Sequence, residues 1–202
     1  MTDGENTSYE TAARWIQEAR ALVVGTGAGM GVDSGLPTFR GRHALVSPLL
    51  KRMNMEYVDI CNPKWFTENA GFAWEFWARC RQEYARATPH EGYHIIRRWA
   101  EAMPWGSFCF TTNIDSQWEL TDWAPERLFE RHGSALFVQC SQPCCSLVWS
   151  DVVRTSKRKG RHDLPQCEWC RALARPNVFM FSDMGFVRDE RGTAQQQNYK
   201  HW

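Results

Sequence analysis

Three groups of residues have types and spacings that could support chemistry. The first is a glycine-rich turn, Gly25–Gly31, which directly follows the apolar run Leu22–Val24. Glycines just after a buried strand let backbone N–H groups approach a phosphate closely. The second is His132, because a histidine side chain suits proton abstraction near neutral pH. The third is a set of cysteines between positions 140 and 170. The groups indicate a nucleotide site, a general base and a metal centre.

The cysteines have the spacing of a structural metal site. Cys167 and Cys170 form a Cys-x-x-Cys pair, and Cys140 and Cys144 lie upstream with a three-residue gap between them. Four thiolates bind zinc in a closed tetrahedral site with no open position. We expect one structural Zn²⁺ per chain on Cys140, Cys144, Cys167 and Cys170, with Cys145 as the alternative to Cys144. A redox Cys-x-x-Cys pair is the rival interpretation.

Short apolar strands and intervening helices must position these groups. The expected strands are at 21–25, 107–111, 127–130 and 177–181. The expected helices are at 8–20, at 91–103 and from 193 onward, and the region 42–104 has a mostly helical pattern. This alternation predicts an α/β fold with a Rossmann-like parallel sheet, helices on both faces, and a small inserted zinc-binding module.

We expect this fold to be one domain over residues 1–202. Its parts are a Rossmann-like part at about 8–136 and 174–202, a helical insert at about 42–104, and the zinc module at about 137–173. The basic run 154–162 lies between the two cysteine pairs. We interpret it as a solvated loop of that module, with contact to an acidic partner or nucleic acid as the alternative.

Composition excludes several classes of partner. The chain has 202 residues and a formal net charge of +1, so no overall field attracts nucleic acid or anionic lipid. No apolar run approaches the roughly 18 residues of a membrane span. The polar N-terminus lacks the basic and apolar segments of an export signal. We therefore expect a cytoplasmic protein that binds neither membrane nor nucleic acid.

The glycine-rich turn belongs to a longer pattern. Residues 26–41 read Thr-Gly-Ala-Gly-x-x-x-x-Ser-Gly-x-Pro-x-Phe-Arg-Gly, which does not fit the common dinucleotide fingerprint Gly-x-Gly-x-x-Gly. The pattern resembles the signature of the sirtuins, the NAD-dependent protein deacylases. Three later segments also resemble sirtuin motifs: Thr112-Asn113-Ile114-Asp115, Glu130-Arg131-His132-Gly133 and Arg175-Pro176-Asn177-Val178.

The resemblance implies roles for individual residues. It implies that backbone N–H groups of Gly27, Ala28 and Gly29 hold the phosphates of NAD. The other cofactor-binding residues that it implies are Phe39, Arg40, Thr112, Asn113, Ile114 and Asp115. It implies that His132 and Asn113 are catalytic, with His132 deprotonating a ribose hydroxyl after nicotinamide leaves.

The chain also departs from the sirtuin pattern. Thr112 stands where the family has Gln, Gly31 where it commonly has Ser, and Ser182 and Asp183 where it has Gly and Glu. Sirtuins continue with a strand ending in Gly-Thr-Ser, which has no counterpart before Trp202. We therefore expect the chain to lack the C-terminal part of the catalytic domain.

The resemblance implies an NAD-dependent lysine deacylase, or deacetylase. Such an enzyme removes an acyl group from the lysine of a protein or peptide and releases nicotinamide and acyl-ADP-ribose. Two alternatives remain open at this point. One is an NAD hydrolase or ADP-ribosyltransferase on the same scaffold, and the other is a truncated, non-catalytic, zinc-stabilised binding module.

Overall fold

A computed structural model of the chain describes residues 3–38, 48–150 and 164–202. Its helices are α1 (Asp3–Glu18), α2 (Pro48–Met53), α3 (Tyr57–Ile60), α4 (Trp65–Glu68), α5 (Ala70–Arg86), α6 (Glu91–Glu101) and α7 (Glu190–His201). Its strands are β1 (Leu22–Thr26), β2 (Ser107–Thr111), β3 (Leu128–Glu130), β4 (Gly133–Cys140), β5 (Val148–Ser150) and β6 (Ala174–Val178). Three 3₁₀ helices are η1 (Ala28–Ser34), η2 (Gln117–Thr121) and η3 (Pro125–Arg127).

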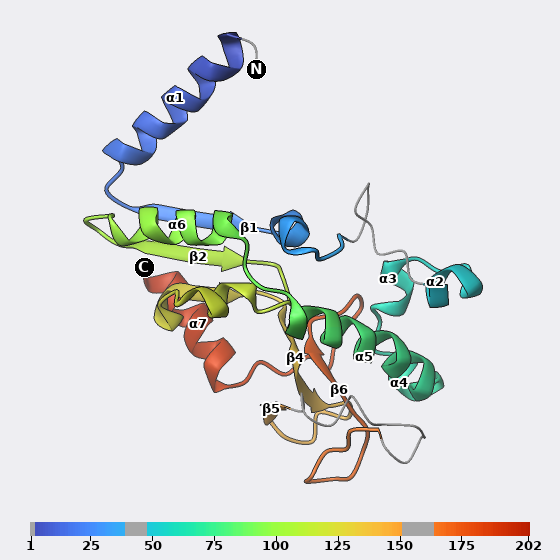
Figure 1. Cartoon of the computed structure of the whole chain (residues 1–202). Helices are drawn as coiled ribbons and strands as arrows, with labels where there is room; N and C mark the ends of the chain where they lie inside the picture. Colours follow the sequence, from blue (N-terminus) through green and yellow to red (C-terminus); the bar gives the residue numbers. More distant parts are fainter. Residues whose placement is uncertain (1–2, 39–47, 151–163) are drawn as a thin grey trace.

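Strands β1, β2 and β3 form a parallel sheet in that order, close to the predicted positions. Successive side chains of a strand point to opposite faces. On one face Phe108 and Phe110 of β2 contact the ring of Tyr199 in α7. On the other, Cys109 shares a buried cluster with Tyr93 of α6. Helices α6 and α7 thus cover opposite faces of this sheet (Figure 1), as the sequence predicts.

Strands β5, β4 and β6 form a second, antiparallel sheet that the sequence analysis does not predict. Strands β4 and β5 are missed altogether. The predicted fourth strand, 177–181, is wrong in bounds and placement, because β6 covers Ala174–Val178 and pairs with β4 instead of the parallel sheet. Its polar residues Arg175 and Asn177 are buried. Each forms hydrogen bonds with another buried side chain, as described below.

The aromatic residues of α3, α4 and α5 form a core on the second sheet. Trp77 is fully buried there, together with Val138 of β4 and Val178 of β6. The indole of Trp74 donates a hydrogen bond to the carbonyl oxygen of Ala174 at 3.0 Å. The helical content of 42–104 is confirmed for the part of this region that the structure describes. These contacts hold α5 against the second sheet.

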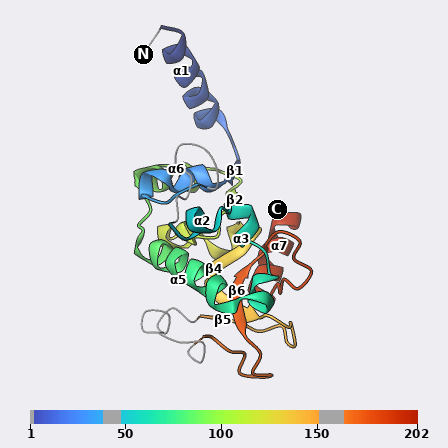
Figure 2. The same cartoon turned by 90° about the vertical axis from the view of Figure 1, so that its right-hand side faces the viewer.

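Helix α1 projects away from the rest of the molecule (Figures 1 and 2). It begins and ends earlier than the predicted helix 8–20, and Tyr9 and Trp15 on it are exposed. Among the helices of residues 3–38, 48–150 and 164–202, none is long and apolar enough to cross a membrane.

Candidate active site and metal centre

The predicted site residues follow the carboxyl ends of the three parallel strands, where ligands bind in such sheets. Gly27 follows β1, Thr112 follows β2, and His132 lies shortly after β3. The backbone N–H of Thr112 donates to the carbonyl oxygen of Thr26 at 3.1 Å. Nδ1 of His132 lies 3.2 Å from the carbonyl oxygen of Thr112. Hydrogen bonds therefore join all three segments at one edge.

The second half of the glycine-rich turn, from Ala28 onward, forms the start of η1, whose first and last turns are fixed by backbone hydrogen bonds. The N–H of Met30 donates to the oxygen of Gly27 at 2.9 Å, and Gly35 closes η1 with a φ of 80°. Gly31 is buried, and a Cβ there would lie 3.2 Å from Cβ of Leu36 and 3.5 Å from Oδ2 of Asp115. A glycine at position 31 thus lets η1 approach Asp115 closely.

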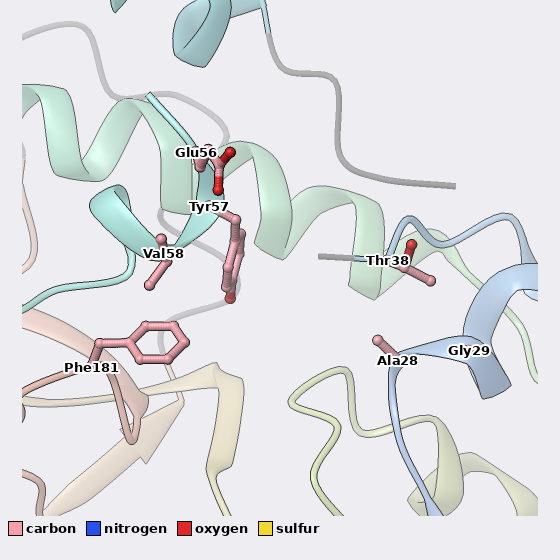
Figure 3. A pocket seen from close by; sticks show the side chains of 7 residues that line it. All are labelled: Ala28, Gly29, Thr38, Glu56, Tyr57, Val58 and Phe181. Carbon is pink, nitrogen blue, oxygen red and sulfur yellow. The ribbon is translucent and has the colours of Figure 1, made fainter. Parts of the chain in front are cut away.

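Two cavities lie beside this edge, and they share Tyr57 and Phe181. The larger has a volume of about 430 Å³, and its lining side chains face one another across it in Figure 3. It is lined by Ala28, Gly29, Thr38, Glu56, Tyr57, Val58 and Phe181. The smaller has a volume of about 200 Å³. It is lined by Tyr57, Cys61, Thr112, Ile114, His132, Val178, Phe179, Met180 and Phe181.

The cavities bring predicted cofactor residues near the predicted base. Ala28 and Gly29 line the larger cavity, and Thr112, Ile114 and His132 line the smaller one. The backbone N–H of Phe181 donates to the oxygen of Cys61 at 2.9 Å, which holds the residues after β6 against α3.

His132 is half-buried, and its ring is arranged to act as a base. Nδ1 faces a carbonyl oxygen, which can only accept, so Nδ1 carries the proton and Nε2 is the basic nitrogen. Burial lowers the pKa of His132, the hydrogen bond to Thr112 opposes this, and the charges of Arg131 and Arg188 lower the pKa further. The ring is therefore neutral near pH 7, which is the form that accepts a proton.

Asn113 and Asp115 are buried just behind the cavity residues. Neither amide atom of the Asn113 side chain has a hydrogen-bond partner among the residues that the structure describes. An unpaired buried polar group costs about 1–3 kcal/mol, so such groups call for a ligand or an ordered water. Asp115 accepts the N–H of Gln117 at 3.0 Å, and burial raises the pKa of its carboxyl group. These two residues fit a polar ligand at this edge.

The four predicted cysteines come together at the ends of β4 and β6. The sulfur atoms of Cys140, Cys144, Cys167 and Cys170 all lie within 4.8 Å of one another. Cys140 and Cys170 are 3.5 Å apart, and Cys144 and Cys167 are 3.6 Å apart. A tetrahedral zinc ion with Zn–S bonds of about 2.3 Å needs sulfur atoms about 3.8 Å apart. The cluster therefore fits zinc, and it contains Cys144 and not Cys145.

Two predictions fall on residues that the structure does not describe. Phe39 and Arg40 lie in 39–47, and the basic run 154–162 lies in 151–163. In turn, sequence reasoning misses Tyr57 of α3, which lines both cavities, and Cys61, which lines the smaller one. No motif in this segment could have found them, because only the packing of α3 against the residues after β6 brings them to the site.

Comparisons with known proteins agree with this geometry. A model described as "Sir2 family" matches residues 27–197. The "NAD-dependent protein deacylase" of Aquifex aeolicus (strain VF5) is 28% identical over 162 residues, which are 80% of this chain and 62% of the relative. The "NAD-dependent protein deacetylase 2" of Geobacillus kaustophilus (strain HTA426) is 28% identical over 85% of this chain and 64% of the relative. The chain thus spans less than two thirds of the length of these relatives.

Solved structures show the same fold. The crystal structure of a Sir2 homolog in complex with NAD superposes with a TM-score of 0.70 at 26% identity, covering 87% of this chain and 62% of that one. A mutant Sir2 homologue in complex with ADP-ribose also gives a TM-score of 0.70, at 27% identity over 87% of this chain and 64% of that one.

Proposed function

Since the chain belongs to the Sir2 family, we propose that it acts as an NAD-dependent lysine deacylase. It would remove an acyl group, such as acetyl, from the lysine of a protein or peptide and release nicotinamide and acyl-ADP-ribose. One observation carries this proposal. A histidine whose Nδ1 faces the carbonyl oxygen of Thr112, so that Nε2 is its basic nitrogen, lies in a cavity that shares two residues with the cavity of the glycine-rich turn.

The glycine-rich turn is the proposed site of the NAD diphosphate. Ala28 and Gly29 line the larger cavity, and their backbone can approach an anion without a large side chain between them. Asn113 and Asp115 would use their buried polar atoms on the nicotinamide ribose and the carboxamide. Gly27, Thr112, Ile114, Phe39 and Arg40 remain predictions for the same ligand.

His132 is the proposed general base. Its Nε2 would accept the proton of a ribose hydroxyl once nicotinamide has left, and Nδ1–H would stay on the oxygen of Thr112 during this step. Phe179 lies beside the imidazole, with ring centroids 6.1 Å apart. The acyl-lysine would enter along residues 178–181, which line the smaller cavity, with its peptide paired to that segment as an added strand.

The proposed zinc ion has a structural role. Four cysteine thiolates complete its coordination, so it would hold the second sheet together and offer no site to a substrate.

The test is incubation of the protein with NAD and an acetylated peptide, followed by mass spectrometry. We expect deacetylated peptide together with acetyl-ADP-ribose. His132→Ala should lower the rate by at least about 100-fold, the usual contribution of a positioned general base. His201→Ala, an exposed histidine in α7, is the matched control and should keep the wild-type rate.

Other outcomes would favour the alternatives. Loss of NAD at equal rates with and without acylated peptide would favour an NAD hydrolase. Failure to bind ADP-ribose in calorimetry, with one zinc ion per chain, would favour a non-catalytic binding module.

A further inference from the structure

His90 makes two contacts with η1, and it is not among the site residues described above. It precedes the first residue of α6. Its Nε2 lies 2.8 Å from the carbonyl oxygen of Met30, and its backbone N–H donates to Oγ of Ser34 at 3.1 Å. One residue therefore holds η1 near both its ends.

The partners of the imidazole define its protonation. Nδ1 lies 3.0 Å from the backbone nitrogen of Gly92, whose N–H can only donate, so Nδ1 is unprotonated. The oxygen of Met30 can only accept, so Nε2 carries the proton. The neutral ring thus caps α6 with one nitrogen and donates to η1 with the other.

Packing keeps the ring in this position. Tyr93 contacts it edge-on with centroids 5.0 Å apart, and Trp118 contacts Tyr93 at 4.7 Å. The indole of Trp118 donates to Oγ1 of Thr26 at 3.0 Å, the residue just before Gly27. Gly92 leaves room for the ring, because a Cβ there would lie 2.5 Å from Cε1 of His90. The half-buried ring therefore lies between η1 and the core beneath the glycine-rich turn.

Capping alone does not explain a histidine here. Ser, Thr, Asp and Asn are the preferred N-cap residues, and each would supply the acceptor for Gly92. None of these side chains has a second group that could, at the same time, donate a hydrogen bond to the carbonyl oxygen of Met30. The choice of histidine thus adds a contact that serves η1 and not α6.

We propose that His90 is a positioning residue for the diphosphate of NAD. It fixes η1 and, through the hydrogen bond from Met30 to Gly27, the backbone N–H groups of the glycine-rich turn. The inference rests on the proposed function for the identity of the ligand. The effect on η1 itself does not depend on it.

The test compares His90→Asn with the wild type. Asparagine keeps the cap of α6 and loses the contact with Met30. We expect faster hydrogen–deuterium exchange at the amides of residues 29–35 and a roughly three- to tenfold weaker affinity for ADP-ribose, as for one lost hydrogen bond. KM for NAD should rise by a similar factor while kcat stays the same. Asp189→Asn, which alters the N-cap of α7, is the matched control. It should change neither the exchange of residues 29–35 nor the affinity for ADP-ribose.

A second variant guards against a folding defect. Ser34→Ala removes the acceptor of the His90 N–H and leaves the imidazole intact, and it should raise exchange in η1 by a smaller amount. Unchanged exchange in both variants would overturn the proposal, and so would unchanged ADP-ribose affinity in His90→Asn. If the wild type itself binds no ADP-ribose, the proposed function fails, and the exchange data still decide whether His90 holds η1.

Discussion

Two buried polar residues, one in the second sheet and one at the edge of the parallel sheet, differ in whether the fold pairs them. In the second sheet, Arg175 forms a two-pronged ion pair with Asp183, with both N–O distances at 2.8 Å, and both side chains are buried. At the edge of the parallel sheet, Asn113 is equally buried, yet its amide has no partner within the described residues. Arg175 is thus paired within the fold, whereas Asn113 keeps both amide atoms for something that binds. This contrast separates a residue that maintains the fold from one proposed to bind a ligand.

Neutral buried side chains of the second sheet are hydrogen-bonded within the fold as well. Asn177 donates to Oε1 of Gln139 at 2.9 Å and to the oxygen of Val187 at 2.7 Å. Oε1 of Gln139 also accepts the N–H of Val187 at 3.0 Å. Buried polar residues here therefore join β4, β6 and the segment before α7 into one unit.

The largest expected effect is the loss of zinc from the second sheet. Cys167→Ser should abolish zinc binding and lower the free energy of unfolding by several kcal/mol, because metal binding and folding are coupled in such sites. Cys145→Ser, outside the cluster, should retain one zinc ion per chain and the wild-type melting temperature. Metal analysis and thermal unfolding measure both. Equal zinc loss in the two variants would refute the assignment of Cys144 over Cys145.

The next effect comes from the buried ion pair. Asp183→Asn leaves the charge of Arg175 buried without its carboxylate and should cost about 3–5 kcal/mol in denaturant unfolding. Breaking the exposed pair of Arg79 and Glu83 by Glu83→Gln should cost less than about 1 kcal/mol. Similar losses in both variants would mean that the pairing in the second sheet does not stabilise the fold.

A direct comparison uses one asparagine from each region. Asn177→Ala removes the side-chain donor to the carbonyl oxygen of Val187 and one of the two donors to Oε1 of Gln139, and it should cost about 1–3 kcal/mol of stability. Asn113→Ala removes an unpaired amide, so the free energy of unfolding should change by less than about 1 kcal/mol while the affinity for ADP-ribose falls. Chemical denaturation and calorimetry provide the two measurements. If Asn113→Ala proved the more destabilising of the two, the contrast between the sheets would be wrong.

A smaller effect concerns the pH dependence at His132. Its pKa is lowered by burial and by the charges of Arg131 and Arg188, so the loss of rate on acidification should occur at lower pH than for an unperturbed imidazole. Arg131→Gln removes a nearby positive charge, which raises the pKa of His132 and shifts the acid limb of kcat/KM to higher pH. Arg79→Gln, an exposed arginine in α5, should not move it. A shift to lower pH in Arg131→Gln would contradict the assignment of the limb to His132.

The smallest effect concerns Ser182, which has a left-handed backbone with a φ of 57°. A residue with a side chain pays about 1–2 kcal/mol to adopt this backbone conformation. Glycine avoids this cost, but it loses more conformational freedom on folding, which offsets part of the gain. Ser182→Gly should therefore raise the free energy of unfolding by about 0.5–1 kcal/mol. Ser150→Gly, in the strand β5, should lower it. Urea titration measures both, and a destabilised Ser182→Gly would argue against backbone strain.

The parallel sheet could be predicted from sequence because its strands are local apolar runs. The second sheet could not. Strand β4 shows no alternation in its burial, and β6 contains Arg175 and Asn177, which resemble surface residues until their partners are known. Those partners, Asp183 and Gln139, come from other segments, so only the tertiary structure shows that the polar residues of β6 are paired when buried. The bounds of α1 also differ, because local pattern defines helix ends poorly.

The residues of the candidate site also divide into those with a local sequence signal and those without one. His132, Asn113 and the four cysteines belong to motifs whose residues lie close in sequence, so the sequence alone could propose them, and the structure brings the four cysteines together. Tyr57 and His90 carry no motif, and their contacts reach residues on separate elements. Sequence therefore identified the residues proposed to perform chemistry, and missed those that shape the cavity and hold the turn.

Tyr57 and Phe181 each line both cavities, and this sharing has a thermodynamic consequence. A side chain adopts one rotamer at a time, so a ligand that fixes either ring in one cavity also sets the wall of the other. Affinities at the two cavities are then linked, and the linkage is reciprocal. Under the proposed function, whatever factor an acyl-peptide contributes to the affinity for ADP-ribose, ADP-ribose contributes the same factor to the affinity for the peptide.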